Sequence, residues 1–220
     1  MGLDNLTIWQ QNVNKSATCQ QNLLNDRYLT KTGVNILALQ EPAINSFNYT
    51  TASKDWTVLY PSPHDKFPKK TRAITMMRTS LRSDSWKQLD FPSSDVIVVE
   101  LSGDWGAITI ANVYNDGDNN TTIGKLTEFH ETQHAGHAPA NALNRHTIWL
   151  GDFNRHHPHW DDPGDSRLFT DEALTAAEQL IEAVAGAGLE LALPAGLPTH
   201  TTMSQKDGHV WTKSSFRIIP

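Results

Sequence analysis

Much of what this sequence says about the protein's architecture is concentrated in one stretch, Thr147-Ile148-Trp149-Leu150-Gly151-Asp152-Phe153-Asn154-Arg155-His156-His157-Pro158-His159-Trp160-Asp161. Its apolar first part predicts a strand that stops at Gly151. Asp152 and Asn154 follow two residues apart, a spacing that places both side chains on the same side of an extended segment. A carboxylate beside an amide at the end of a strand suits a metal–phosphate site, whereas a single Gly-Asp pair by itself also fits an ordinary turn.

Length and charge limit the possible classes of protein. The chain has 220 residues, enough for one domain or at most two small ones. Its formal net charge of −6 argues against a strongly basic nucleic-acid coat protein. The charge is compatible with an enzyme that meets phosphates through a bound divalent cation, because the ion is itself a large local positive charge.

Cysteine usage and hydropathy bear on the compartment. Cys19 is the single cysteine of the sequence, which argues against a disulfide framework and a Cys-type zinc site. A reducing, intracellular compartment is therefore expected. No signal-peptide core follows Met1 and no apolar run approaches about 18 residues, so neither secretion nor membrane spanning is expected.

Strand-type stretches recur along the chain, and several end in polar residues. The first covers residues 6–14, and the second covers residues 34–42, running into Glu41 before Pro42 breaks it. Residues 96–101 and 107–114 are separated by a Gly-Asp-Trp-Gly turn, which predicts a hairpin. Further strands are expected at residues 56–60, 73–77 and 189–193.

Three segments predict helices. Ser16 is expected to cap the first, which would run to about Leu29. Helical spacing returns weakly through Leu126 and Phe129. A last helix begins at Thr170 or Asp171 and ends near Gly186, with one apolar face formed by Leu174, Ala177, Leu180, Ile181 and Val184. Mixed hairpins and helical crossovers imply a layered α+β protein, with sheets packed face to face and helices outside.

Two groups of side chains allow more than one interpretation. The loop at residues 61–71 and the adjoining Arg72 supply four positive charges, Lys66, Lys69, Lys70 and Arg72. They fit either a solvated loop or a contact to a phosphate backbone. His156, His157 and His159 permit a zinc site, but Pro158 separates them and no helix or strand fixes a tetrahedron, so packing beside the site is favoured. His134 and His137 are a still weaker metal pair for the same reason.

Four short motifs together carry a resemblance to a known family: Gln11-Asn12-Val13-Asn14, Leu39-Gln40-Glu41-Pro42, Asn112-Val113-Tyr114 and Gly151-Asp152-Phe153-Asn154. Their order and spacing resemble the endonuclease/exonuclease/phosphatase superfamily, the fold of the apurinic endonucleases. The continuation Arg-His-His-Pro-His-Trp, with Pro198-Thr199-His200 downstream, looks most like the endonuclease domain of non-LTR retrotransposons. The likeness runs from about residue 6 to residue 201.

The resemblance implies a fold, an activity and a role for each matched residue. The fold would be a four-layer α/β/β/α sandwich, and the activity would be hydrolysis of DNA phosphodiester bonds by a nuclear, monomeric enzyme. Glu41 would ligate a divalent cation, Mg²⁺ or Mn²⁺, with Asn12 beside it. Tyr114 would help to hold the scissile phosphate, Asp152 would activate or orient the attacking water, and Asn154 would fix the phosphate. The chemistry agrees, because phosphodiester hydrolysis needs charge neutralisation, a base and fixed donors.

The carboxyl-terminal tail departs from the family pattern. Relatives end in Ser-Arg-Leu-Asp, a strand, and then Ser-Asp-His, whose Asp–His pair acts on the phosphate. Residues 202–220 lack this pattern, so we expect a domain at residues 1–201, a non-family tail with its last strand missing or altered, and impaired catalysis. We hypothesise a reading-frame shift near Thr201: read one base earlier, Trp211 and Thr212 force an Asp codon, and permitted codons around it allow the whole family ending. The gene sequence around codon 201 tests this.

Two other functions remain open at this point. One is a phosphatase or phosphodiesterase of the same superfamily that acts on another phosphate ester, such as inositol phosphates, lipids or RNA tails. The other is a non-catalytic remnant that at most binds nucleic acid. Because no reverse-transcriptase region follows, the chain is expected to be a fragment or a decayed copy of a retrotransposon protein.

Overall fold

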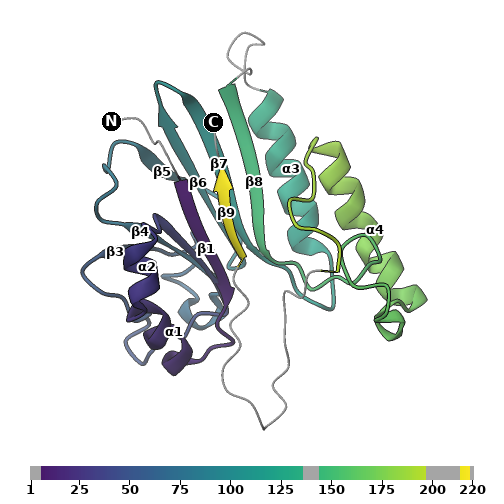
Figure 1. The fold of residues 1–220 in the computed structure, drawn as a ribbon, viewed down its shortest axis with the longest axis horizontal. Helices are drawn as coiled ribbons and strands as arrows, with labels where there is room; N and C mark the ends of the chain where they lie inside the picture. The colour runs from purple at the N-terminus through teal and green to yellow at the C-terminus, as the bar shows by residue number, and fades with distance from the viewer. Residues whose placement is uncertain (1–5, 136–143, 197–213, 219–220) are drawn as a thin grey trace.

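Two β-sheets form the centre of the computed structural model, which describes residues 6–135, 144–196 and 214–218 (Figure 1). The first sheet has the strand order β3-β4-β2-β1-β9, and the second has the order β5-β6-β7-β8. The first comprises β1 (Leu6–Asn12), β2 (Ile36–Gln40), β3 (Trp56–Leu59), β4 (Ala73–Arg78) and β9 (Ser214–Ile218). The second comprises β5 (Trp86–Leu89), β6 (Val96–Gly103), β7 (Gly106–Tyr114) and β8 (Arg145–Asp152).

Strand direction decides where the polar strand ends meet. β1 runs parallel to β2 in the first sheet, and β7 runs parallel to β8 in the second. The predicted hairpin of β6 and β7 is antiparallel, as expected. Because parallel neighbours share a carboxyl edge, the residues that follow β1 and β2 lie together, and so do those that follow β7 and β8.

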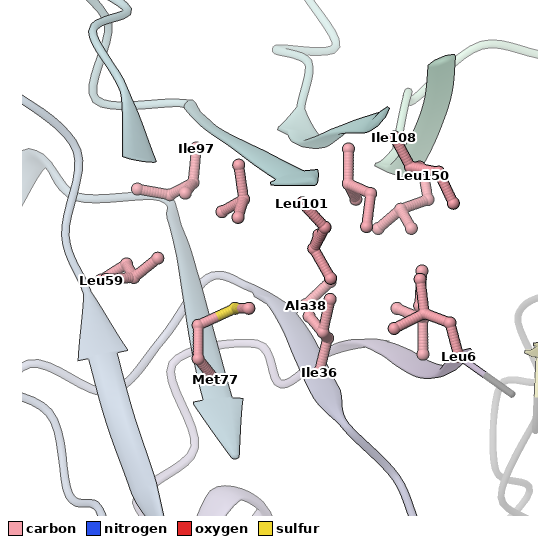
Figure 2. Close-up of a cluster of buried hydrophobic side chains, with 12 residues drawn as sticks. Leu6, Ile36, Ala38, Leu59, Met77, Ile97, Leu101, Ile108 and Leu150 are labelled. Carbon is pink, nitrogen blue, oxygen red and sulfur yellow. The ribbon is translucent and has the colours of Figure 1, made fainter. Parts of the chain in front are cut away.

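The sheets pack face to face over an apolar core. Alternate residues of both sheets point inward: Leu101 of the second sheet lies over Ile36 and Ala38 of the first, and Ile108 and Leu150 lie on the side of Leu6 (Figure 2). Because a β-strand turns successive side chains to opposite faces, the same strands also carry a second set of buried residues on their outer faces.

Helices cover those outer faces. Helices α1 (Ala17–Leu24) and α2 (Arg27–Lys31) bury Leu23 and Leu29 against the first sheet. Helix α3 (Thr121–Ala135) covers the second sheet through Leu126, and α4 (Asp171–Gly186) packs on α3 through Leu180 and Ala183. The result is the expected α+β arrangement of two sheets between two helical layers.

Two of the predicted elements differ in detail. Ser16 caps α1 as predicted, and its side chain accepts a hydrogen bond from the Cys19 amide. The single helix expected at residues 16–29 is two helices, because Asp26 caps a new one by accepting from the Tyr28 amide. Strand β5 was not predicted, since its four residues are only partly buried or exposed and give little alternation.

One further prediction was wrong. Residues 189–193 form no strand but an irregular segment after α4, and Leu191 is 55% exposed there. In the tail, where the last strand was expected to be missing or altered, Ser214–Ile218 forms β9, antiparallel to β1 at the edge of the first sheet. Pro198, Thr199, His200 and His137 lie outside the described residues. None of the helices in the described part of the chain combines the length and apolar character needed to cross a bilayer.

Candidate active site

Asn12 joins the ends of the two sheets. It is the last residue of β1, and its amide nitrogen donates to Glu41 Oε2 at 3.2 Å and to Asp152 Oδ2 at 2.8 Å. Glu41 directly follows β2 in the first sheet, whereas Asp152 ends β8 in the second. Because one nitrogen serves both acceptors, the two carboxylates are close neighbours, as the sequence motifs predict.

The orientation of the Asn12 amide is fixed by the loop that follows it. Its Oδ1 accepts from the Asn14 backbone amide at 2.8 Å, which leaves the NH₂ group to face the carboxylates. Lys15 adds a positive charge on the open side, with its Nζ at 3.8 Å from Glu41 Oε1. The Lys15 backbone amide also donates to the Glu41 carbonyl at 2.7 Å, so this loop and the end of β2 hold each other.

Gly151 allows β8 to approach β7 beside the site. Its φ is +141°, and a Cβ built at this position would lie 1.9 Å from the Val113 carbonyl oxygen. Only glycine fits such a close approach of two backbones. The glycine of the Gly-Asp-Phe-Asn motif therefore brings Asp152 next to the end of β7.

Asn154 holds Asp152 in place. Its backbone amide donates to Asp152 Oδ1 at 3.2 Å, and its side-chain amide donates to the Asn115 carbonyl at 2.8 Å. The side-chain amide of Asn115 in turn donates a hydrogen bond to the Phe153 carbonyl at 3.0 Å. The structure thus places Asn154 at the site, with part of its donor capacity already committed to the loop after β7.

Tyr114 lies at the end of β7, within the electrostatic influence of both carboxylates. Burial raises the pKa of its hydroxyl above the ordinary value, and the negative charges of Glu41 and Asp152 raise it further. The guanidinium of Arg72, 4.8 Å from the centre of the Tyr114 ring, acts in the opposite direction. The Tyr114 hydroxyl therefore stays protonated at neutral pH and is available as a hydrogen-bond donor.

Arg72 ties three loops together beneath Tyr114. It forms a two-bond pair with Asp95, at 2.7 Å and 2.8 Å, and a further ion pair with Asp116. These hydrogen bonds raise the pKa of the Arg72 guanidinium, so it stays charged. Of the four cations near residues 61–72, Arg72 is thus engaged within the protein rather than free for a phosphate.

Strained backbone is concentrated at the site. Residues with positive φ include Asn14 at 47°, Lys15 at 54°, Glu41 at 48° and Asn154 at 48°. For a lysine or a glutamate this conformation costs about 1–2 kcal/mol. Such strain persists where surrounding structure enforces it, and it clusters at functional sites.

Arg155 was not predicted as a structural residue, yet it organises the loops around the site. It is only 7% exposed, and its donors reach Asn120 Oδ1, the Ala176 carbonyl and the carbonyls of the loop at residues 116–119. It thereby ties the segment after Asp152 to α4 and to the loop after β7. Nothing in the sequence distinguishes it from an exposed arginine, because its acceptors are backbone oxygens from remote segments.

A buried polar cluster supports the site from between the sheets. Gln40 at the end of β2 and Asn112 in β7 are 0% and 1% exposed and are hydrogen bonded to each other. Asn112 also donates to the Ile74 carbonyl at 2.7 Å, and Gln10 donates to Gln40. Because buried polar groups are expensive unless paired, this cluster fixes how the two sheets are aligned just below Asn12.

The histidines after Asn154 pack on one another and on neighbouring side chains, as favoured from the sequence. His157 accepts a hydrogen bond from the His159 backbone amide at 3.1 Å, and its ring lies 5.3 Å from that of Trp160. His156 Nδ1 lies 3.2 Å from Asp161 Oδ2. Among the described residues, no three His, Cys, Asp or Glu side chains gather as a metal site.

The donor set around Asn12 nevertheless suits a hard cation. Two carboxylates lie within hydrogen-bond distance of the same Asn12 NH₂ group, and carboxylate oxygens are ligands that Mg²⁺ accepts. Mg²⁺ keeps several waters and needs only one or two protein carboxylates. The Glu41 carboxylate would hold such an ion with Asn12 beside it, and the Asp152 carboxylate is a close neighbour of both.

Residues 108–215 match the family model described as endonuclease-reverse transcriptase. No curated protein matches the sequence.

Solved structures share the fold. The endonuclease domain of TRAS1, a telomere-specific non-LTR retrotransposon, is 14% identical, with a TM-score of 0.65, over 96% of this chain and 81% of that one. The AP endonuclease LMAP from Leishmania major is also 14% identical, with a TM-score of 0.60, over 84% of this chain and 67% of that one. The chain therefore has the fold of the endonuclease/exonuclease/phosphatase superfamily, and residues 108–215 match its endonuclease-reverse transcriptase family.

Proposed function

We propose that this protein is a divalent-metal-dependent phosphodiester hydrolase that cuts DNA, derived from a retrotransposon. The observation that carries the proposal is the Asn12 amide, which bridges the carboxylates of Glu41 and Asp152 from two different sheets. The matched endonuclease-reverse transcriptase family and the fold shared with a retrotransposon endonuclease support DNA as the substrate.

Each residue has a role that follows from its position. A divalent cation on Glu41 and Asn12, when bound, would neutralise charge on the phosphate oxygens. Asp152, whose Oδ1 is held by the Asn154 amide, orients a water and takes its proton. Tyr114, protonated because its pKa is raised, donates to a phosphate oxygen as negative charge develops there.

The rate is expected to be low, because the tail lacks the Asp–His pair of the family. A positioned acid–base group contributes about 10² to 10⁴ in rate. A matched variant replaces residues 202–220 with the ending that the shifted frame allows, Asn-Val-Thr-Lys-Arg-Trp-Ser-Arg-Leu-Asp-Gln-Val-Phe-Leu-Ser-Asp-His-Ser. The variant should nick DNA about 10² to 10⁴ times faster than this chain. Equal rates would show that the tail costs no activity.

Parallel assays separate the proposed function from its alternatives. Supercoiled plasmid is incubated with the protein and Mg²⁺ over hours, with EDTA as the blank, while phosphate release is measured from small phosphate esters. Slow, EDTA-sensitive nicking without phosphate release supports the endonuclease. Phosphate release without nicking favours a phosphatase, and DNA binding without either reaction favours a non-catalytic remnant.

A further inference from the structure

Next to Glu41 lies a groove that the catalytic roles above do not use. It has a volume of about 300 Å³, and its lining runs from Lys15 through Pro42 and Asn45 to Lys69. Lys15 is the residue whose ammonium faces the Glu41 carboxylate, so the groove is continuous with the candidate active site. It is bordered by the turn at residues 43–50 and by the loop at residues 61–71.

The lining of the groove carries positive charge although the whole chain is acidic. The chain has a net charge of −6, yet the lining includes two lysines and neither aspartate nor glutamate; Lys15 also faces the Glu41 carboxylate, at 3.8 Å. The ammonium of Lys69 bonds to the Ile44 and Asn45 carbonyls, at 3.1 Å and 2.5 Å, and these neutral acceptors leave its positive charge uncompensated. A local positive field in an acidic protein suits a polyanion.

Exposed aromatic side chains are concentrated in the two loops that border the groove. Five large hydrophobic residues are exposed in the described part of the chain, and three lie in the two bordering loops: Phe47 (79%), Tyr49 (57%) and Phe67 (50%). Scattered exposed apolar residues are ordinary, but a cluster beside a polar site marks a binding surface. Lys69 and the ring contact of Tyr49 with His64, at 6.3 Å, join the two loops.

Internal hydrogen bonds fix the turn on which Phe47 is exposed. Asn45 Oδ1 accepts from the Phe47 amide at 2.8 Å and from the Tyr49 amide at 3.2 Å. The Asn45 amide donates to the Tyr49 carbonyl at 2.8 Å, and Asn48 takes a positive φ of 68°. An aromatic ring on a turn with this many internal bonds loses little further freedom on binding.

We propose that Phe47 is a base-stacking residue, on which a base of the DNA strand rests while Lys15 and Lys69 contact the phosphates leading to the active site. Every base presents a flat face to an aromatic ring, and the backbone follows the positive groove. Phe47 is six residues from Glu41, so it lies within roughly 20 Å of it, a few nucleotides along a strand. The inference rests on the proposed function in one respect, that the strand bound here is the one cut at Glu41.

Binding in EDTA tests the inference without requiring cleavage. The probe is a fluorescein-labelled single strand of twenty dT nucleotides, followed by anisotropy. Phe47→Ala should weaken binding roughly 5- to 150-fold, Phe47→Leu should behave like alanine because it cannot stack, and Phe47→Trp should retain affinity. Leu191→Ala, another exposed apolar residue in a different loop, is the matched control and should change nothing.

The salt dependence of the DNA affinity distinguishes base stacking on Phe47 from the phosphate contacts of the lysines. Phe47→Ala should leave the slope of log affinity against log salt unchanged, because stacking releases no counterions. Lys15→Ala should reduce that slope by about 0.7. Equal affinities of the protein and Phe47→Ala or Phe47→Leu, or no binding of the strand at all, would overturn the inference. Phe47-dependent binding without plasmid nicking would sustain it and count against the proposed endonuclease.

Discussion

At the scale of single residues, Asn12 joins the carboxylates that the two sheets contribute to the site. It donates to Glu41 and Asp152 at once, and Asn14 fixes its orientation. Asn12→Ala should therefore weaken the binding of Mg²⁺, raising the concentration that gives half-maximal nicking about 10- to 100-fold. A Mg²⁺ titration of the nicking rate measures this, and an unchanged midpoint would show that Asn12 does not support the metal.

Gly151 is the residue whose replacement should damage the structure most directly. Gly151→Ala places a Cβ 1.9 Å from the Val113 carbonyl oxygen at a φ of +141°, so the ends of β7 and β8 must separate. We expect a loss of about 3 kcal/mol or more, or a fall in Tm of roughly 6 to 12 °C. Gly124→Ala, whose Cβ would lie 3.6 Å from the Gln179 amide within a helix, should be neutral or slightly stabilising. Equal melting temperatures of the two variants would refute this account of Gly151.

At the scale of elements, the loop at residues 61–71 carries a buried histidine. This histidine should make the stability of the folded protein sensitive to acid. His64 is 4% exposed, stacks on Tyr60 with ring centres 4.0 Å apart, and bonds to Thr71 Oγ1 at 2.7 Å. Burial lowers the pKa of His64 below its ordinary value of 6.5, although the charge of Asp65 opposes this.

The sign of the pH effect follows from that direction. The unfolded chain binds a proton at His64 more readily than the folded chain, so the stability it contributes is complete above about pH 6.5 and falls as the pH drops below that value. The His64→Gln variant has no group that binds a proton at this position. The advantage in Tm of the natural protein over His64→Gln should therefore shrink between pH 7.5 and pH 5.5, and a constant difference would contradict the assignment.

Strand β9 gives a second prediction at this scale. Because it covers the edge of β1, its removal exposes unpaired backbone groups of a sheet edge. A chain that ends at Lys213 should melt at a lower temperature and associate in size-exclusion chromatography. A chain that ends at Ile218 is the control and should resemble the full protein; identical behaviour of the two would show that β9 contributes nothing.

Elements with strong local signals could be predicted, and those fixed by remote contacts could not. The strand before Gly151, the cap at Ser16 and the apolar face of α4 are all encoded in neighbouring residues, and all were predicted. Strand β9 has no such pattern and owes its state to pairing with β1, far away in sequence. Residues 189–193 carry strand-type apolar residues but find no sheet edge, so they stay irregular.

The same distinction holds at the site. Asn12, Glu41, Tyr114, Asp152 and Asn154 could be located because each follows or ends a strand within a family motif. Their roles remain predictions, although the structure brings them together. Arg155 and Arg72 could not be assigned from sequence, because their partners are backbone carbonyls and carboxylates that only the fold brings near.

At the scale of the whole molecule, the site exists only because the two sheets are stacked. Glu41 belongs to the first sheet and Asp152 to the second, and the buried pair of Gln40 and Asn112 aligns them. Neither sheet alone carries both carboxylates. We therefore expect Glu41 and Asp152 to act together in a single metal-dependent site.

Plasmid nicking by Glu41→Gln and Asp152→Asn, alone and combined, tests this claim most directly. Asp84→Asn, at an exposed carboxylate paired with Arg82, is the control. We predict slow nicking by the natural protein and by Asp84→Asn in Mg²⁺, and loss of nicking in each site variant with no further loss when the two are combined. Nicking that persists in either site variant, or that survives EDTA, would contradict the account, as would the absence of any nicking by the natural protein over hours.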